Sequence, residues 1–142
     1  MKYLFLPLMS LFLCTFTLSA QNRKEMCQLT IHFETPEKAE GKVYFLVFDK
    51  PENFGDESKA YNYGIVNPPL VTISLPYGEY AVTCFEDTKI NGKMDKNLVG
   101  IPTEPVGTSD NPRLMGSPKW KDAAFSVNQP KQEITVKLKK IL

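Results

Sequence analysis

The sequence has little of what enzymes usually use for catalysis. It contains one histidine, three cysteines and one tryptophan among 142 residues. No motif links the histidine, His32, to a nucleophile, and we expect it on the polar face of a strand. The sequence also lacks a Gly-x-Ser-x-Gly motif, a phosphate-binding glycine loop and a Cys/His metal-binding spacing. These absences favour a non-catalytic protein and leave a hydrolase as the least favoured alternative.

An excess of charge of one sign is missing as well. Lys and Arg together number 17, and Asp and Glu number 16. A net charge near zero, with no basic stripe along the sequence, argues against nucleic acid or an anionic membrane surface as the partner.

The N-terminal segment 1–20 predicts a secretory signal peptide. One positive charge precedes an apolar run over 4–18, and small residues precede a polar stretch. The run is too short and too interrupted for a membrane span, so we expect none after cleavage. We expect cleavage after Ala20, with a lipoprotein acylated at Cys14 as the alternative. Residues 21–142 then form one extracytoplasmic domain, in the periplasm, at the cell surface or secreted.

Cleavage would leave two cysteines, Cys27 and Cys84, in a compartment where disulfides persist. Both fall on faces that we expect to point inward. They either form a disulfide or are buried as two small free thiols, because the sequence does not give the distance between them.

Alternation of apolar and polar residues dominates the rest of the chain and predicts strands. The expected strands cover 27–33, 42–48, 70–75, 79–85, 123–127 and 133–139, with a short edge strand between Pro51 and Pro69. Turn residues at 76–78 predict a hairpin between two of them. No window predicts a long helix. We therefore expect an all-β fold, a single antiparallel Greek-key β-sandwich of about seven strands.

Within the last strand, Ile134, Val136 and Leu138 are expected to point inward. Lys137 and Lys139 alternate with them and are typical of the lysines that protect an exposed edge strand from pairing with another chain.

A long stretch at about 86–121 has no clear period and is punctuated by Gly and Pro, so we expect a loop that carries function or folds around an ion. Its first part places Asp87, Asn91 and Asp95 at positions one, five and nine of a calcium-loop spacing. Gly92 would supply the tight turn, and Lys93 would offer its backbone carbonyl. Calcium is therefore the one cofactor that the sequence suggests.

Two positions depart from this spacing, since Lys89 and Leu98 stand where oxygen ligands belong. We therefore favour the other interpretation, in which Asp87 and Asn91 accept hydrogen bonds from their own backbone in Asx turns and Asn91-Gly92 forms a tight turn.

Several segments, densest from Gly78 onward, resemble an uncharacterised exported bacterial family known as domain of unknown function 2141. They are Gly78-Glu79-Tyr80-Ala81-Val82, Phe85-Glu86-Asp87, Asn91-Gly92-Lys93-Met94-Asp95, Gly100-Ile101-Pro102-Thr103-Glu104 and Gly116-Ser117-Pro118-Lys119-Trp120-Lys121-Asp122-Ala123 with Phe125. The 75–82 pattern is also similar to prealbumin-like sandwich modules. These resemblances imply a prealbumin-like or immunoglobulin-like fold and no particular activity.

We therefore expect an exported, non-catalytic binding or accessory module with the long loop as its contact surface. Its partner would be a protein, a small molecule or a glycan. The expected contact residues are Tyr61, Tyr63, Glu104 and Trp120, although for Trp120 we favour a place in the core over a contact. A homodimer through the apolar row Tyr44, Leu46 and Phe48 is a further expectation. The alternative is a structural domain stabilised by calcium.

Overall fold

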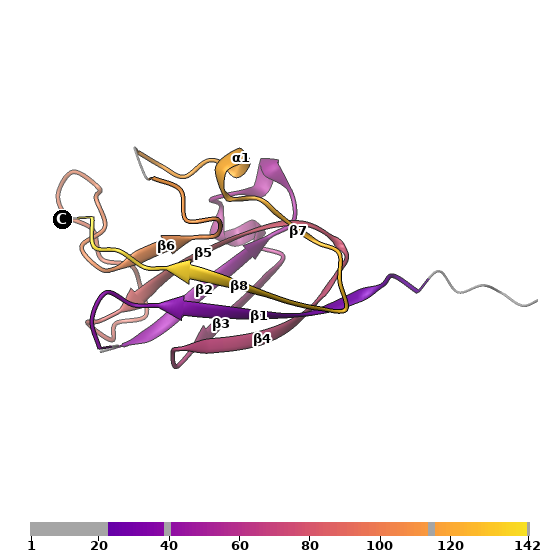
Figure 1. The fold of residues 1–142 in the computed structure, drawn as a ribbon. Coiled ribbons are helices and arrows are strands. Elements are labelled where there is room, and N and C mark those ends of the chain that lie inside the picture. Colours follow the sequence, from indigo (N-terminus) through magenta and orange to yellow (C-terminus); the bar gives the residue numbers. More distant parts are fainter. Residues whose placement is uncertain (1–22, 39–40, 114–115, 142) are drawn as a thin grey trace, which may run out of the picture.

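Eight strands in two layers make up the described part of the chain (Figure 1). The computed structural model describes residues 23–38, 41–113 and 116–141. The strands are β1 (Met26–Glu34), β2 (Lys42–Phe48), β3 (Asn62–Val66), β4 (Leu70–Pro76), β5 (Gly78–Asp87), β6 (Val106–Thr108), β7 (Phe125–Val127) and β8 (Lys131–Lys137). The expected all-β fold is confirmed, although the strand count is eight and not about seven.

The smaller layer is a three-stranded sheet in the order β4-β1-β8. β1 pairs antiparallel with β4, with Leu29 opposite Ile73, and parallel with β8, with Ile31 opposite Ile134. The prediction of a purely antiparallel sandwich is therefore wrong at β8. The chain crosses from β7 in the other sheet at the end where β1 begins, and the Gln28 N–H donates to the Pro130 carbonyl there, so β8 runs beside β1 in the same direction.

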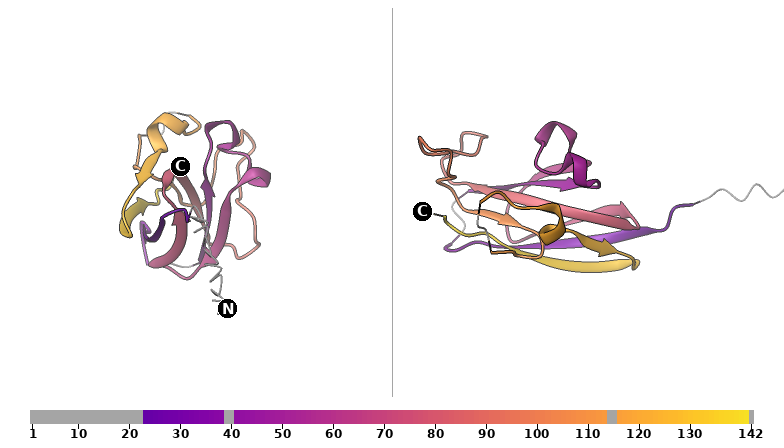
Figure 2. Two further views of the ribbon diagram at one scale, coloured as in Figure 1. Left: turned by 90° about the vertical axis from the view of Figure 1, so that its right-hand side faces the viewer. Right: turned by 90° about the horizontal axis from the view of Figure 1, so that it is seen from above.

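The larger layer has five strands, with the path β3-β2-β5-β6 and β7 paired to β5. β2 is central in this sheet, as its apolar residues predicted, and β3 is the expected short edge strand. The two layers are seen at right angles to the first view in Figure 2.

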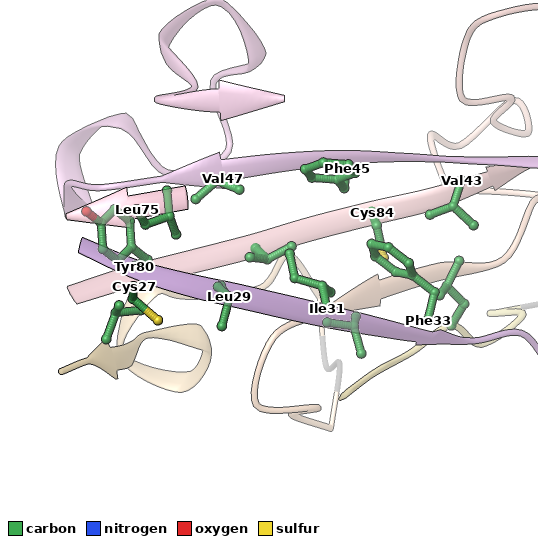
Figure 3. Close-up of a cluster of buried hydrophobic side chains, with 14 residues drawn as sticks. Cys27, Leu29, Ile31, Phe33, Val43, Phe45, Val47, Leu75, Tyr80 and Cys84 are labelled. Carbon is green, nitrogen blue, oxygen red and sulfur yellow. The ribbon is translucent and has the colours of Figure 1, made fainter. Parts of the chain in front are cut away.

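The core lies between the two sheets and follows the alternation of the sequence (Figure 3). Its members are Cys27, Leu29, Ile31, Phe33, Val43, Phe45, Val47, Leu75, Tyr80, Val82, Cys84, Val127, Val136 and Leu138. The Phe33 and Phe45 rings, one from each sheet, are 5.9 Å apart. Burying an aliphatic or aromatic side chain of this size contributes about 1.5–3 kcal/mol, so this layer supplies most of the driving force for folding.

The predicted hairpin between β4 and β5 is wrong. The two strands follow each other in sequence but belong to different sheets, so residues 76–78 carry the chain across the sandwich. The Tyr77 N–H donates to the Glu25 carbonyl at 2.9 Å at this crossing. Pro and Gly support either kind of turn, so the local sequence did not distinguish them.

The long stretch at 86–121 is not one loop. Glu86 and Asp87 end β5, β6 interrupts the stretch, and a short helix α1 (Trp120–Ala123) closes it. α1 also replaces the first residue of the strand expected at 123–127. Within the described ranges, no helix is both long and apolar enough to cross a bilayer. The expected signal peptide and Cys14 lie outside the described residues.

Candidate functional site

The two outer surfaces of the sandwich differ in chemistry. The outer side of the three-stranded sheet carries polar pairs across neighbouring strands: Gln28 with Ser74, Thr30 with Thr72, and His32 with Glu133. His32 Nε2 is 3.8 Å from the Glu133 carboxylate on this open surface. This side is therefore mainly polar, with Met26 and Leu70 as single exposed apolar residues, and the histidine lies where the sequence predicted it.

The outer side of the five-stranded sheet has an apolar centre, with Thr83 and Lys42 beside it. Tyr44, Leu46, Tyr63, Ile65 and Phe85 lie on it, and we call these five residues the apolar face. The register places Tyr44 between Ile65 and Phe85, and Leu46 opposite Tyr63. The Tyr44 and Phe85 rings stack with centroids 5.0 Å apart, whereas Tyr63 and Ile65 are 76% and 57% exposed. A contiguous apolar surface of this kind typically marks a binding site.

An aromatic cluster covers the sheet beyond the apolar face. Phe48 is fully buried because Phe54 packs edge-on against it at 5.5 Å, and Trp120 packs edge-on against Phe54 at 5.9 Å. Figure 1 shows α1, which carries Trp120, beside the segment that carries Phe54. Trp120 Nε1 donates to Glu79 Oε1 at 3.1 Å. Phe48 is therefore not available to the apolar row expected to form a homodimer. Trp120 is half-buried and packs against Phe54.

The two tyrosines expected as contacts have different neighbours. Tyr63 is on the apolar face, while the Tyr61 ring is 5.9 Å from that of the buried Tyr80. Tyr61 thus covers the end of the core. Of the expected contact residues, Tyr63 is the one that lies on a continuous apolar surface.

Glu104 anchors the long loop. It is 1% exposed, and its carboxylate accepts backbone N–H bonds from Thr88 at 2.6 Å, Lys89 at 3.4 Å and Asp95 at 2.9 Å. The expectation that Glu104 belongs to a contact surface is therefore replaced by a structural role. Its donors are far from it in sequence, and no local pattern signals the interaction.

Asp87 organises the tip of the same loop. It is buried, and its two oxygens accept the N–H groups of Asn91 at 3.2 Å and Gly92 at 2.7 Å. The Gly92 φ of 75° is readily accessible to glycine. Asn91 in turn donates its amide to the Asp95 carboxylate at 2.8 Å and accepts the Lys93 N–H at 3.2 Å. These are the Asx-type bonds of the interpretation that the sequence favoured over a calcium loop.

The residues proposed as calcium ligands are thus close together, but backbone and amide N–H groups already approach their carboxylates. The hydrogen bond from Asn91 is the main cause that lowers the pKa of Asp95. Within the described ranges, no three His, Cys, Asp or Glu side chains are grouped as metal ligands. This geometry favours a loop held by its own hydrogen bonds.

The loop exposes large apolar side chains and borders the apolar face. Ile90 and Val99 are largely exposed, and Leu98 is fully so. A side-chain carbon built on Gly92 would be 3.9 Å from the Tyr44 hydroxyl. The apolar face and the loop are therefore neighbouring parts of one surface.

Cys27 and Cys84 are buried free thiols, one in each sheet. Figure 3 shows them at different points along the core, and Cys84 Sγ donates to the Gly107 carbonyl at 3.7 Å. The disulfide alternative is therefore not what the structure contains. Burial raises the pKa of both thiols, which keeps them protonated and poorly reactive at neutral pH.

A family model matches most of the described sandwich. That model is described as an uncharacterized protein conserved in bacteria (DUF2141), and it covers residues 31–135. The chain belongs to this family. The DUF2141 match contains the apolar face and the whole of the anchored loop, and it confirms the resemblance seen in the sequence. No curated protein and no solved structure matches the chain.

Proposed function

We propose that this DUF2141 chain is an exported, non-catalytic binding module whose contact surface is the apolar face and the adjoining loop. One observation supports this most: Tyr63 and Ile65 are exposed next to Tyr44 and Leu46 on one outer side of the sandwich, while the other outer side is mainly polar and exposes Met26 and Leu70 only singly. A soluble sandwich has no structural need for such an asymmetry, because both outer sides could be polar.

The partner is a protein that presents a flat apolar surface. The apolar face lies on strands of a sheet and not in a deep cleft, which suits a macromolecular surface better than a small molecule. Its aromatic residues are of the type that contributes most to protein interfaces. A second copy of the chain and a glycan are the alternative occupants.

Export and the finer fold belong to the same proposal. The signal-peptide pattern in 1–20 would deliver the module outside the cytoplasm. The two-layer arrangement of strands is compatible with a Greek-key, prealbumin-like or immunoglobulin-like assignment.

Site-specific photo-crosslinking in the producing cell tests the contact surface. A benzophenone amino acid is placed at Tyr63 or Ile65, and at Gln28 or Thr72 on the polar side as controls. We expect a product of defined mass from the first two positions only. A mass of twice the chain identifies a second copy, and any other protein mass identifies the partner.

A matched pair of variants shows whether the product depends on the apolar face. Leu46→Ser should abolish crosslinking from Tyr63, while Thr30→Ser on the polar side should leave it unchanged. Equal products from the polar side, or no product from Tyr63 and Ile65, would show that the apolar face is not the contact surface.

A further inference from the structure

A second surface feature lies on the opposite edge of the five-stranded sheet from β3. A groove of ≈ 400 Å³ runs between β6 and the segment that follows β8. Four cations line it, Arg113, Lys137, Lys139 and Lys140, and no acidic residue does. We call it the basic groove. The chain as a whole is nearly neutral, so this is a local concentration of positive charge.

The lysines of the basic groove are not explained by protection of an edge strand. Asn111 donates its amide to the Thr135 carbonyl at 2.9 Å and accepts the Lys137 N–H at 2.8 Å. Val106 and Lys139 exchange backbone hydrogen bonds at 3.0 and 2.8 Å. The backbone edge beside both lysines is therefore already paired, and charge is not needed there to prevent aggregation.

The floor of the groove is tightly packed. A side-chain carbon built on Gly107 would be 2.9 Å from Val136 Cγ1 and 3.1 Å from the Lys137 carbonyl oxygen. β6 thus lies directly against the end of β8, and the main chain that carries the cations is well supported.

The cations approach the same space from two sides. Lys137 and Lys139 alternate with the buried Val136 and Leu138, so both point outward, about 7 Å apart along the extended chain. Arg113 comes from the segment after β6. Lys140 is 3.4 Å from Glu37, an exposed pair that neutralises only part of the charge.

We propose that the basic groove binds a phosphate group. A phosphate carries a charge near −2 and several acceptor oxygens, which matches converging ammonium and guanidinium donors. The guanidinium of Arg113 suits two oxygens of one phosphate, and the lysines act as point charges around it. A soluble phosphate monoester and the phosphodiester headgroup of an anionic phospholipid, which carries one negative charge, both offer such acceptor oxygens.

The test uses the chain recovered from expression of the full sequence, with inorganic pyrophosphate and phospholipid vesicles as probes. Pyrophosphate is titrated while amide NMR shifts are followed, and we expect shifts at Gly107 and Asn111 that weaken with added sodium chloride. Flotation with vesicles of phosphatidylglycerol in phosphatidylcholine, against phosphatidylcholine alone, tests the lipid source.

Two variants with the same change in net charge separate the groove from diffuse electrostatics. Lys137→Gln/Lys139→Gln should weaken binding about tenfold, as expected for two exposed charge contacts. Lys50→Gln/Lys131→Gln, with exposed lysines elsewhere, should change it less than about twofold.

Each outcome bears on the proposal. Groove-localised shifts lost in the groove variant support a soluble phosphate ligand. If the groove variant alone fails to float with phosphatidylglycerol vesicles, and pyrophosphate causes no shifts, the same site binds a lipid headgroup. Absence of binding to both probes, or equal loss in the control variant, overturns the proposal.

Discussion

Replacement of Glu104 tests whether one buried carboxylate holds the long loop. Its two shortest backbone bonds come from Thr88 at 2.6 Å and Asp95 at 2.9 Å. Hydrogen bonds to a charged group contribute about 1.5–3 kcal/mol each. Because water can reach part of the loop, we take the low end and expect Glu104→Ala to lower the free energy of unfolding by about 3 kcal/mol.

The isosteric Glu104→Gln variant refines the prediction. One oxygen accepts the Thr88 and Lys89 N–H groups and the Thr88 hydroxyl, and the other accepts the Asp95 N–H. The glutamine carbonyl can replace the first oxygen, but its NH₂ group would then face the Asp95 N–H, donor against donor. We expect the free energy of unfolding to fall by about 1–2 kcal/mol, because only the contact with the Asp95 N–H is weakened.

Urea denaturation and amide hydrogen exchange measure these effects. Glu104→Ala should speed exchange at both Thr88 and Asp95, while Glu104→Gln should speed it at Asp95 alone. Glu57→Ala, an exposed glutamate, is the control and should stay within about 0.5 kcal/mol of the unmodified chain. A similarly small change for Glu104→Ala, with unchanged exchange at both amides, would refute the anchoring role.

Three further predictions follow from the packing and the pKa shifts. Gly107→Ala should lower the free energy of unfolding, measured with urea, by about 1–3 kcal/mol, because its new carbon would be 2.9 Å from Val136 Cγ1. Gly78→Ala, where the nearest atom is 3.5 Å away, should lower it clearly less. Equal losses in the two variants would contradict the packing argument. Burial raises the pKa of Tyr80 to about 12 from 10.0, so the unfolded chain loses the Tyr80 hydroxyl proton at a lower pH than the folded chain does. The free energy of unfolding should therefore fall by about 1–2 kcal/mol as pH rises from about 10 to 12. Tyr80→Phe should be less stable at pH 8 but should flatten this alkaline decline, and an unchanged decline would exclude Tyr80 as its source. Calcium and chelator should give the same thermal midpoint if hydrogen bonds hold the 87–95 loop, and a midpoint raised by calcium would favour the calcium-stabilised alternative.

The layers of the fold were predictable from the sequence, whereas the connections between them were not. Alternation at Leu29 and Ile31, and the apolar run of β2, determine which side chains are buried, and burial is a local property of the pattern. The sheet to which a strand belongs depends on distant partners. The turn before Gly78 therefore suggested a hairpin where the chain crosses between sheets.

The candidate sites show the same division. The Asx-type bonds of Asp87 lie within a few residues, and the sequence favoured them over a calcium loop. The role of Glu104 depends on Thr88, far away in sequence, and no short motif encodes it. The basic groove is lined by Arg113 and Lys137, which are distant in sequence. The net charge of the whole chain, near zero, does not reveal that cations cluster there.

The parallel pairing of β1 with β8 has a consequence for the order of folding. β1 is N-terminal to every other strand described, yet one of its two neighbours is the most C-terminal of them. The three-stranded layer therefore cannot form until synthesis has passed Lys137, and early collapse of a partial chain would leave one edge of β1 open.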